Sequence, residues 1–180
     1  MKRHIHVFGA SGAGTTTISQ IVSKQSGYMH FDSDNYFWLP TANPFTVERE
    51  RDECLKMMTE DLSENDKWVL SGSIANWGNI LIPYFDLVVF VYVPSEIRLK
   101  RLKKREHERY GDEILYGGSR YKESLEFLDW AASYDEGTKN GRSLAKHEEW
   151  LKNISCTKLK IINIDLDMSI ETVLQAISSE

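Results

Sequence analysis

The sequence predicts a doubly wound α/β fold, in which helices cover both faces of a parallel β-sheet. Two observations point to this fold class. Short apolar runs that are typical of strands alternate along the chain with longer segments whose apolar residues recur at helical spacing. The run DLVVFVYV at residues 86–93 is apolar almost throughout, as expected for a strand buried on both faces of a parallel sheet. At 180 residues, the chain is long enough for one domain over residues 1–180.

Strands are predicted from apolar runs and helices from apolar residues at helical spacing. The ends of both are predicted from residues that stop such elements. The predicted strands cover residues 4–8, 28–31, 67–73, 86–93 and 158–164. The predicted helices cover residues 15–26, 46–62, 96–109, 124–137, 143–154 and 169–177. Gly27 is expected to end the first helix, and Thr46 and Ser169 to cap the second and the last. An aromatic loop with two prolines, residues 35–45, precedes the second helix.

Composition and charge exclude several classes of protein. The net charge of −5 argues against a general nucleic-acid binder, which would carry a basic surface. Cys54 and Cys156 lie far apart and lack metal-ligand spacing, so we expect neither a disulfide framework nor a zinc site. This cysteine content fits a protein of the reducing cytoplasm. The N-terminal apolar run is short and interrupted by His6, which argues against a signal peptide or a membrane span. We therefore expect a cytoplasmic monomer or weak dimer without nucleic-acid or membrane partners.

The glycine-rich segment GASGAGTTT lies between the first predicted strand and the first predicted helix, as a phosphate-binding loop does. Gly9, Gly14 and Thr16 match the pattern G-x-x-x-x-G-K-[ST], and Thr16 is placed to put its hydroxyl on Mg²⁺. Backbone N–H groups and the positive end of the helix would surround an anion there. The residues expected to bind nucleotide are Gly9, Ala10, Ser11, Gly12, Ala13, Gly14, Thr15, Thr16 and Thr17. A tight turn with glycines for packing alone is the alternative.

Thr15 stands where the pattern has lysine. That lysine normally reaches the β- and γ-phosphates, and threonine supplies a hydroxyl without charge. Three consequences stay open: another cation substitutes, the chemistry is slow, or nucleotide is bound without turnover.

Two carboxylates follow the second predicted strand. Asp32 and Asp34 are two residues apart, so on an extended segment they point to the same side. One suits Mg²⁺, and the other suits orienting a substrate hydroxyl or accepting its proton. A turn with aspartate caps is the alternative.

Small and aromatic residues are candidates for an acceptor pocket. Ser71, Gly72 and Ser73 end the third strand, where small side chains let a substrate approach the backbone. Asn76, Trp77, Tyr36, Phe37 and Trp38 could line the same pocket, although an aromatic cluster is more often core. The substrate-binding candidates are Asp34, Trp38, Ser71, Gly72, Ser73 and Trp77.

A basic helix leaves the end of the best-defined strand. Arg98, Arg101 and Arg105 lie at spacings of three and four and share one helical face. Arginine binds phosphate in a bidentate fork, so we favour at least one of Arg101 and Arg105 in the site over a merely solvated surface. Arg120 and Arg142 are weaker candidates. The histidines form no constellation, and we expect His107 and His147 at the surface.

Taken together, the chain resembles the small P-loop kinases of the nucleoside-monophosphate-kinase and shikimate-kinase group. More narrowly, it is similar to their adenylate-kinase-related bacterial members, whose loop reads GASG-x-GTTT. The motifs that carry the resemblance are GASGAGTTT (9–17), FDSDNYFWLP (31–40), WVLSGS (68–73), DLVVFVYV (86–93), RLKRLKKR (98–105) and GRSLAKHEEWL (141–151). Asp32 and Asp34 match the D-x-D of the shikimate-kinase-like branch, whereas SGS replaces the D-G-[FY]-P-R of adenylate kinases.

The resemblance implies a three-layer P-loop NTPase fold, with a five-stranded parallel sheet in the order 2-3-1-4-5 and a lid over about residues 106–140. It also implies that Arg101 contacts the adenine side of ATP, that Arg105 begins the lid and that Arg142 returns to the phosphates. The turn 165–168 would border the base, and the absence of a Cys cluster predicts no lid zinc.

We therefore expect an ATP-dependent small-molecule kinase that uses Mg²⁺. Thr16 and Asp32 would hold the metal, and Asp34 would orient the acceptor. Arg101, Arg105 and Arg142 would supply the charge that Thr15 lacks. The alternative is a nucleotide-binding regulatory module with little or no turnover. An RNA- or DNA-associated ATPase is disfavoured by the net charge.

Overall fold

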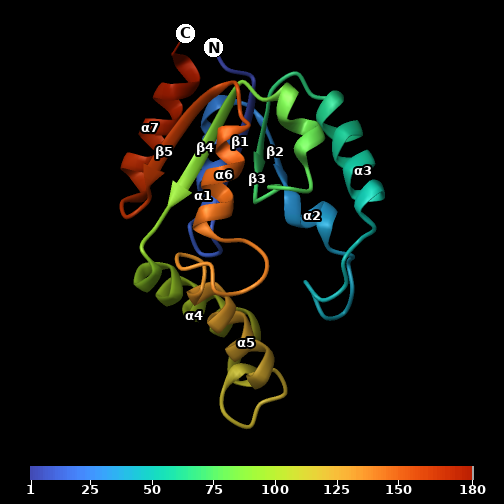
Figure 1. Cartoon of the computed structure of the whole chain (residues 1–180), viewed down its shortest axis with the longest axis vertical. Coiled ribbons are helices and arrows are strands. Elements are labelled where there is room, and N and C mark those ends of the chain that lie inside the picture. The colour runs from blue at the N-terminus through green and yellow to red at the C-terminus, as the bar shows by residue number, and fades with distance from the viewer. Residues whose placement is uncertain (180) are drawn as a thin grey trace.

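The computed structural model of the chain describes residues 1–179 and confirms the predicted α/β fold. Five parallel strands form one sheet in the order β2-β3-β1-β4-β5 (Figure 1). The strands are β1 (His4–Gly9), β2 (Met29–Asp32), β3 (Trp68–Ser71), β4 (Leu87–Tyr92) and β5 (Thr157–Ile162). The α-helices are α1 (Thr15–Ser26), α2 (Ser33–Phe37), α3 (Arg51–Ser63), α4 (Ser95–Tyr110), α5 (Tyr121–Ala132), α6 (Leu144–Lys152) and α7 (Leu166–Ser178). The 3₁₀ helix η1 (Asn79–Tyr84) lies between β3 and β4, and the 3₁₀ helix η2 (Gly111–Ile114) lies between α4 and α5.

The sheet is buried on both faces because helices pack on each side. Alternate residues of β1 point to opposite faces, so Ile5 and Val7 enter one core while Phe8 enters the other. The first core is completed by α1 and α7, and the second by α3 and α6. All six residues of β4 are buried or half-buried, which explains why its sequence is apolar throughout.

The strands all run towards the same end of the molecule. The carboxyl end of β4 points at the extension formed by α4, η2 and α5, which projects away from the sheet (Figure 1). The lid expected over residues 106–140 falls largely in this extension. None of the helices within residues 1–179 combines the length and the apolarity that a membrane-spanning helix requires.

The boundaries of several predicted elements are wrong; the helix predicted over residues 124–137, for example, spans Tyr121–Ala132. The second long helix begins at Arg51 and not at residue 46, because the preceding loop folds back on itself through the bridge between Trp38 and Glu48. Thr46 donates its hydroxyl to the carbonyl of Asn43 inside that loop, and Glu50 caps α3 instead. Residues 33–37 form the short helix α2, so Asp34 is a helical residue and does not lie on the extended segment that was expected to carry both carboxylates.

The last helix also starts earlier than predicted. Asp165 accepts a hydrogen bond from the N–H of Met168 and is the N-cap of α7. Ser169 is therefore a helical residue, and its one O–H is shared between the carbonyl of Asp165 at 2.7 Å and Oδ1 of Asn163 at 3.1 Å. Ser169 anchors the start of the helix from within.

Candidate active site

The glycine-rich loop wraps around the N-terminus of α1. Gly12 and Gly14 have φ angles of 80° and 87°, in the left-handed region that favours glycine. A Cβ atom at Gly9 would lie 2.3 Å from the carbonyl oxygen of Val91, so the loop also packs too closely on β4 for any side chain there. No side chain caps α1, which leaves its first N–H groups turned towards the loop. This is an anion-binding arrangement.

Thr16 and Asp32 meet at the floor of the site. The Thr16 hydroxyl donates to Oδ2 of Asp32 at 2.8 Å. The other oxygen of Asp32, Oδ1, accepts the N–H of Asp34 at 3.0 Å and makes Asp32 the N-cap of α2. A hydroxyl and a carboxylate oxygen at one point form a donor set that suits Mg²⁺.

Asp34 lies close to two arginines at the open end of the sheet. Desolvation by the surrounding walls, followed by the charge of Asp32, raises the pKa of the Asp34 carboxyl, while Arg142 and Arg105 partly counter this. The side chain still contacts solvent, so the shift is moderated by water. Burial lowers the pKa of Arg142, and the charge of Asp34 opposes that change. The two groups therefore stabilise each other's charged form.

Arg101 lies beside the phosphate loop. A Cβ atom on Gly14 would stand 3.9 Å from its Nη1, and its Nη2 donates to the backbone carbonyl of Asn163 at 2.9 Å. The side-chain amide of Asn163 in turn donates to the carbonyl of Ala13 at 2.8 Å. One asparagine thus holds both the phosphate loop and the arginine next to it.

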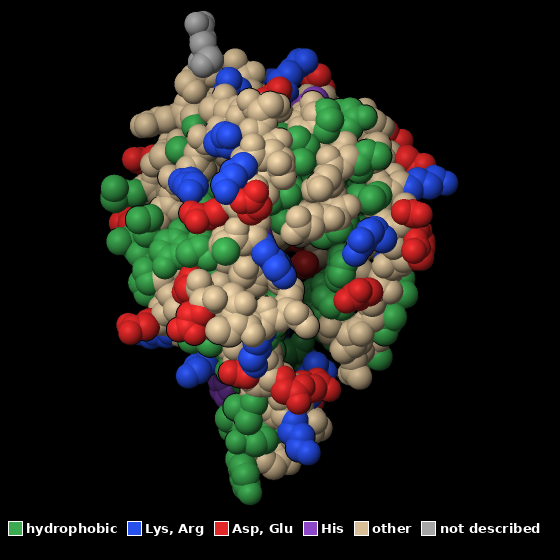
Figure 2. All heavy atoms as spheres, viewed as in Figure 1, with side chains coloured by type: hydrophobic (Ala, Val, Ile, Leu, Met, Phe, Trp, Pro, Cys, Tyr) green, Lys and Arg blue, Asp and Glu red, His purple; other side chains and the backbone are tan. Residues whose placement is uncertain are grey.

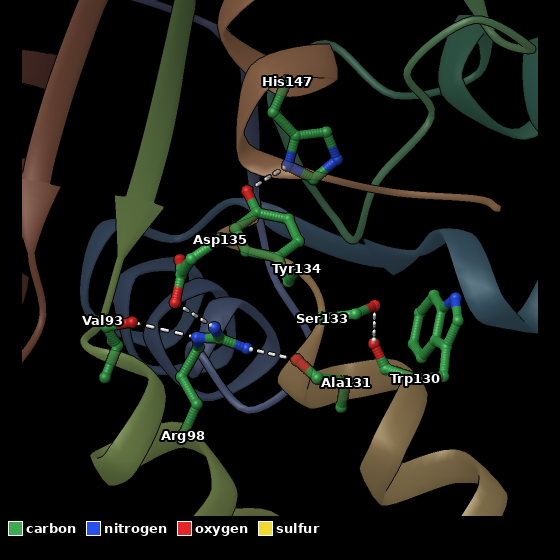
Figure 3. Close-up of polar contacts among 8 residues, drawn as sticks. All are labelled: Val93, Arg98, Trp130, Ala131, Ser133, Tyr134, Asp135 and His147. Atoms are coloured by element: carbon green, nitrogen blue, oxygen red, sulfur yellow. Dashed lines mark hydrogen bonds and ion pairs between the residues drawn. The ribbon is translucent and has the colours of Figure 1, made fainter. Parts of the chain in front are cut away.

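Arg98 lies apart from Arg101 and Arg105, the other two candidate arginines of α4. It is fully buried and donates to the carbonyls of Val93 and Ala131 and to Oδ2 of Asp135 (Figure 3). These contacts attach the segment after α5 to the junction of β4 and α4. The shared helical face expected from the sequence therefore does not carry Arg98 into the site, whereas Arg101 and Arg105 line it.

A cleft of about 1000 Å³ joins these groups. On the face drawn in Figure 2, acidic and basic side chains surround a hollow above the extension. The predicted site residues that line the cleft are Gly9, Ala10, Ser11, Gly12, Gly14, Thr15, Thr16, Thr17, Asp32, Asp34, Trp38, Gly72, Ser73, Arg101, Arg105 and Arg142. Segments that are far apart in sequence are therefore brought together at the carboxyl end of the sheet.

Three predicted site residues contribute no surface to this cleft. The side chain of Ala13 is buried in the core beneath the loop. Ser71 lies within the sheet, where its hydroxyl donates to the carbonyl of Phe31. Trp77 lies behind Ser73 and donates from Nε1 to the Ser73 carbonyl at 3.1 Å. Ser71 and Trp77 therefore lie next to the site without lining the cleft.

The surface position predicted for His147 is wrong. The side chain is fully buried and shares hydrogen bonds with the Ser73 hydroxyl at 2.8 Å and the Tyr134 hydroxyl at 2.7 Å. Its neighbours Lys146, Glu148 and Glu149 suggested a charged surface. The spacing of His147 to Trp150 and Leu151, both buried, is the signal that indicates an inward face.

Arg109 was not predicted as a site residue, and Arg120 was only a weaker candidate. Both line the cleft from the extension. Arg109 lies over the ring of Phe45 and Arg120 over that of Tyr110, with 5.2 and 4.2 Å to the ring centroids. Because Phe45 and Arg109 are far apart in sequence, no local pattern could reveal their contact.

Comparisons with known proteins concern the family and the fold of the chain. A family model described as "AAA domain" matches residues 5–129. A protein of Bacillus subtilis (strain 168) with the name "Uncharacterized protein YqaC" is 46% identical over 180 residues, covering 99% of each chain. A cytidylate kinase of Archaeoglobus fulgidus is 27% identical over 113 residues, covering 57% of this chain and 61% of its own.

Solved structures show the same fold. The shikimate kinase of Acinetobacter baumannii in complex with shikimate superposes with a TM-score of 0.60 at 18% sequence identity, covering 97% of this chain and 92% of its own. At this identity the likeness concerns the fold alone.

Proposed function

Because this chain belongs to the P-loop small-molecule kinase family, with a match to the AAA domain over residues 5–129, we propose that it transfers a phosphoryl group from ATP to a small-molecule acceptor. One observation carries the proposal. A phosphate-binding loop, a carboxylate with a raised pKa and several arginines all face the same cleft. Each part has a role in phosphoryl transfer, and none is explained by packing alone.

Residues 9–17 would bind the phosphates through backbone N–H groups and the N-terminus of α1. Thr16 and Asp32 would hold Mg²⁺, since Mg²⁺ in kinase sites is bound by one or two protein oxygens together with substrate phosphates. The metal supplies positive charge to the β- and γ-phosphate oxygens.

Arginines would replace the charge that Thr15 does not provide. Arg101 lies at the phosphate loop, while Arg105 and Arg142 face the cleft near Asp34. Guanidinium groups bind phosphate oxygens in a bidentate fork and remain charged at every physiological pH. Charge aimed at the transferring group is the main catalytic contribution that a protein makes to this reaction.

Asp34 would orient the acceptor group and take up its proton. Its pKa is raised by burial and by Asp32, which makes it a better base than an ordinary aspartate while it stays within reach of solvent. Trp38 and Ser73 line the same cleft and would border the acceptor.

Thr15 favours a second candidate, a nucleotide-binding regulatory module with little turnover. Transfer assays with ATP and cytidylate, adenylate or shikimate separate the two functions. Thermal-shift measurements with ATP and Mg²⁺ establish binding beforehand, because a ligand at 100 times Kd stabilises by roughly 2.7 kcal/mol. Transfer to any acceptor supports the kinase, whereas tight ATP binding without transfer to any of the three supports the regulatory module.

A further inference from the structure

A chain of hydrogen bonds runs from the interior to the cleft. Tyr134, which follows α5, contacts Nδ1 of His147 at 2.7 Å (Figure 3), and Nε2 of His147 contacts the Ser73 hydroxyl at 2.8 Å. Tyr134 and His147 are buried, while Ser73 lines the cleft. The proposed function gives no role to the two buried members.

The protonation of the chain follows from its burial. Burial, reinforced by the charge of Arg142, lowers the pKa of His147 to about 3, so the imidazole is neutral and has one proton for two nitrogens. Burial raises the pKa of Tyr134, so its hydroxyl keeps its proton. Two arrangements remain, which differ in the nitrogen that bears the proton.

Tyr134 decides between these arrangements. Within residues 1–179, His147 is the only hydrogen-bond partner of its hydroxyl. If Nδ1 carried the proton, the phenol O–H would be a buried donor without an acceptor, which is costly. Tyr134 therefore donates to Nδ1, the proton of His147 is on Nε2, and Nε2 donates to the oxygen of Ser73.

Ser73 is then held from two sides. Its hydroxyl oxygen accepts from His147, and its carbonyl accepts from Nε1 of Trp77. The O–H of Ser73 cannot donate to a nitrogen that already bears a proton, and the described residues offer it no other acceptor. Because the side chain borders the cleft, this O–H is available to a bound molecule.

We propose that Ser73 is a specificity-determining residue that donates a hydrogen bond to the phosphoryl acceptor, with Tyr134 and His147 as positioning residues. The molecule that fits has a hydrogen-bond-accepting oxygen at this point, such as that of a phosphate, a carboxylate or a carbonyl. A compound that presents only N–H groups there would leave the O–H of Ser73 without an acceptor. This inference rests on the proposed function for the identity of the cleft.

The tautomer can be measured without any substrate. ¹⁵N chemical shifts of histidine-labelled protein at pH 7 should assign the proton of His147 to Nε2, with the signal identified by its loss in His147→Gln. In Tyr134→Phe the single-tautomer signal should be lost, whereas it should persist in Tyr28→Phe, a matched control that removes a buried tyrosine hydroxyl bonded to the Lys2 carbonyl. A charged imidazole, or a proton on Nδ1 in the wild type, overturns the proposal.

The role in specificity is tested with ATP and whichever of cytidylate, adenylate and shikimate the wild type phosphorylates. Ser73→Ala and Tyr134→Phe should each raise the acceptor KM about tenfold, the scale of a lost hydrogen bond, and leave the ATP KM within about twofold. Ser73→Thr should restore the acceptor KM. An unchanged acceptor KM, or an equal rise for ATP, overturns the proposal. Absence of transfer by the wild type is instead a failure of the proposed function, and the tautomer measurement is independent of it.

Discussion

The hydroxyl of Thr16 donates a 2.8 Å hydrogen bond to Oδ2 of Asp32, and this bond joins the first turn of α1 to the end of β2. Parallel strands place their carboxyl ends at one edge, so a residue after β1 and a residue at the end of β2 meet although β3 lies between the two strands. This edge of the sheet is where the proposed ATP and Mg²⁺ would bind.

Asp32→Asn should weaken Mg²⁺-dependent ATP binding by about tenfold or more. The reason is that an interaction with a charged group contributes roughly 1.5–3 kcal/mol, and the substitution removes the charge. Asparagine is an equally good N-cap, so α2 should keep its start. Calorimetric titration of ATP with and without Mg²⁺ measures the effect. Equal Mg²⁺ dependence in variant and wild type would contradict the metal role.

Asp34→Asn should reduce transfer while ATP binding stays close to that of the wild type. The role as a base also sets a pH dependence. Because the pKa of Asp34 is raised, activity should fall on acidification at a higher pH than an ordinary aspartate would produce. Turnover against pH measures this, and a variant that keeps its full turnover would show that Asp34 is not the base.

Arg101→Ala and Arg105→Ala should each reduce turnover by at least about tenfold, or roughly 1.4 kcal/mol of barrier. Thr15→Lys should partly rescue either loss, because it returns a charge to the same phosphates. Lys104→Ala is the matched control, since Lys104 is an exposed cation on the same helix, paired with Glu108.

The double variants decide this compensation. If neither arginine affects the turnover of an active wild type, the charge comes from another residue. If the wild type binds ATP without transfer and Thr15→Lys activates hydrolysis, the regulatory module is the correct function.

Gly14→Ala should reduce both stability and ATP affinity. Gly14 and Gly27 both have left-handed φ angles, so alanine costs about 1–2 kcal/mol at either position. Only at Gly14 does the new Cβ meet a neighbour, Nδ2 of Asn163 at 2.8 Å, while the space around Gly27 is open. Gly27→Ala should therefore reduce stability and leave ATP affinity unchanged. Wild-type ATP affinity in Gly14→Ala would refute the phosphate-loop assignment.

Stability should depend on pH through two buried histidines. Burial lowers the pKa of both His6 and His147 from 6.5 to about 3. Between these values the unfolded chain binds more protons than the folded one, so the free energy of unfolding falls as pH falls from 6.5 towards 3. Each histidine contributes up to about 1.4 kcal/mol per pH unit.

Urea unfolding at a series of pH values measures that slope. His6→Leu removes one of the two buried histidines and should make the dependence shallower by up to about 1.4 kcal/mol per pH unit. His6 suits this change because it stacks between Phe8 and Phe85 and leaves its Nε2 without a partner within residues 1–179. A slope that does not change in the variant would contradict the linkage.

The strands were predictable from the sequence because their signal is local. Val88 and Val89 lie on opposite sides of β4 and both are fully buried, so an uninterrupted apolar run is enough to identify that strand. The strand order came from the resemblance to P-loop kinases and not from periodicity. The start of α3 was not predictable because the preceding loop is held by contacts between distant residues, the bridge between Trp38 and Glu48 and the hydrogen bond from Arg49 Nε to the carbonyl of Tyr36.

The candidate site was predictable where a motif carries its chemistry, as it does for Thr16 and Asp32. It was not predictable where a contact forms only in three dimensions. Tyr134 and Ser73 lie on different segments, and His147 joins them from a helix whose neighbouring side chains are charged. Arg98 shares a helical face with Arg101 in sequence, yet the carbonyl of Ala131 and the carboxylate of Asp135 draw it inward.

The amide of Asn163 has a consequence for the order in which the protein is made. The phosphate loop lies at the start of the chain, but the carbonyl of Ala13 receives its hydrogen bond from a residue 150 positions later. A ribosome therefore releases residues 9–17 long before their support exists, and the nascent loop lacks this hydrogen bond until residue 163 has been synthesised. Because chains otherwise begin to fold from the N-terminus, nucleotide affinity should be acquired only when β5 and α7 have emerged.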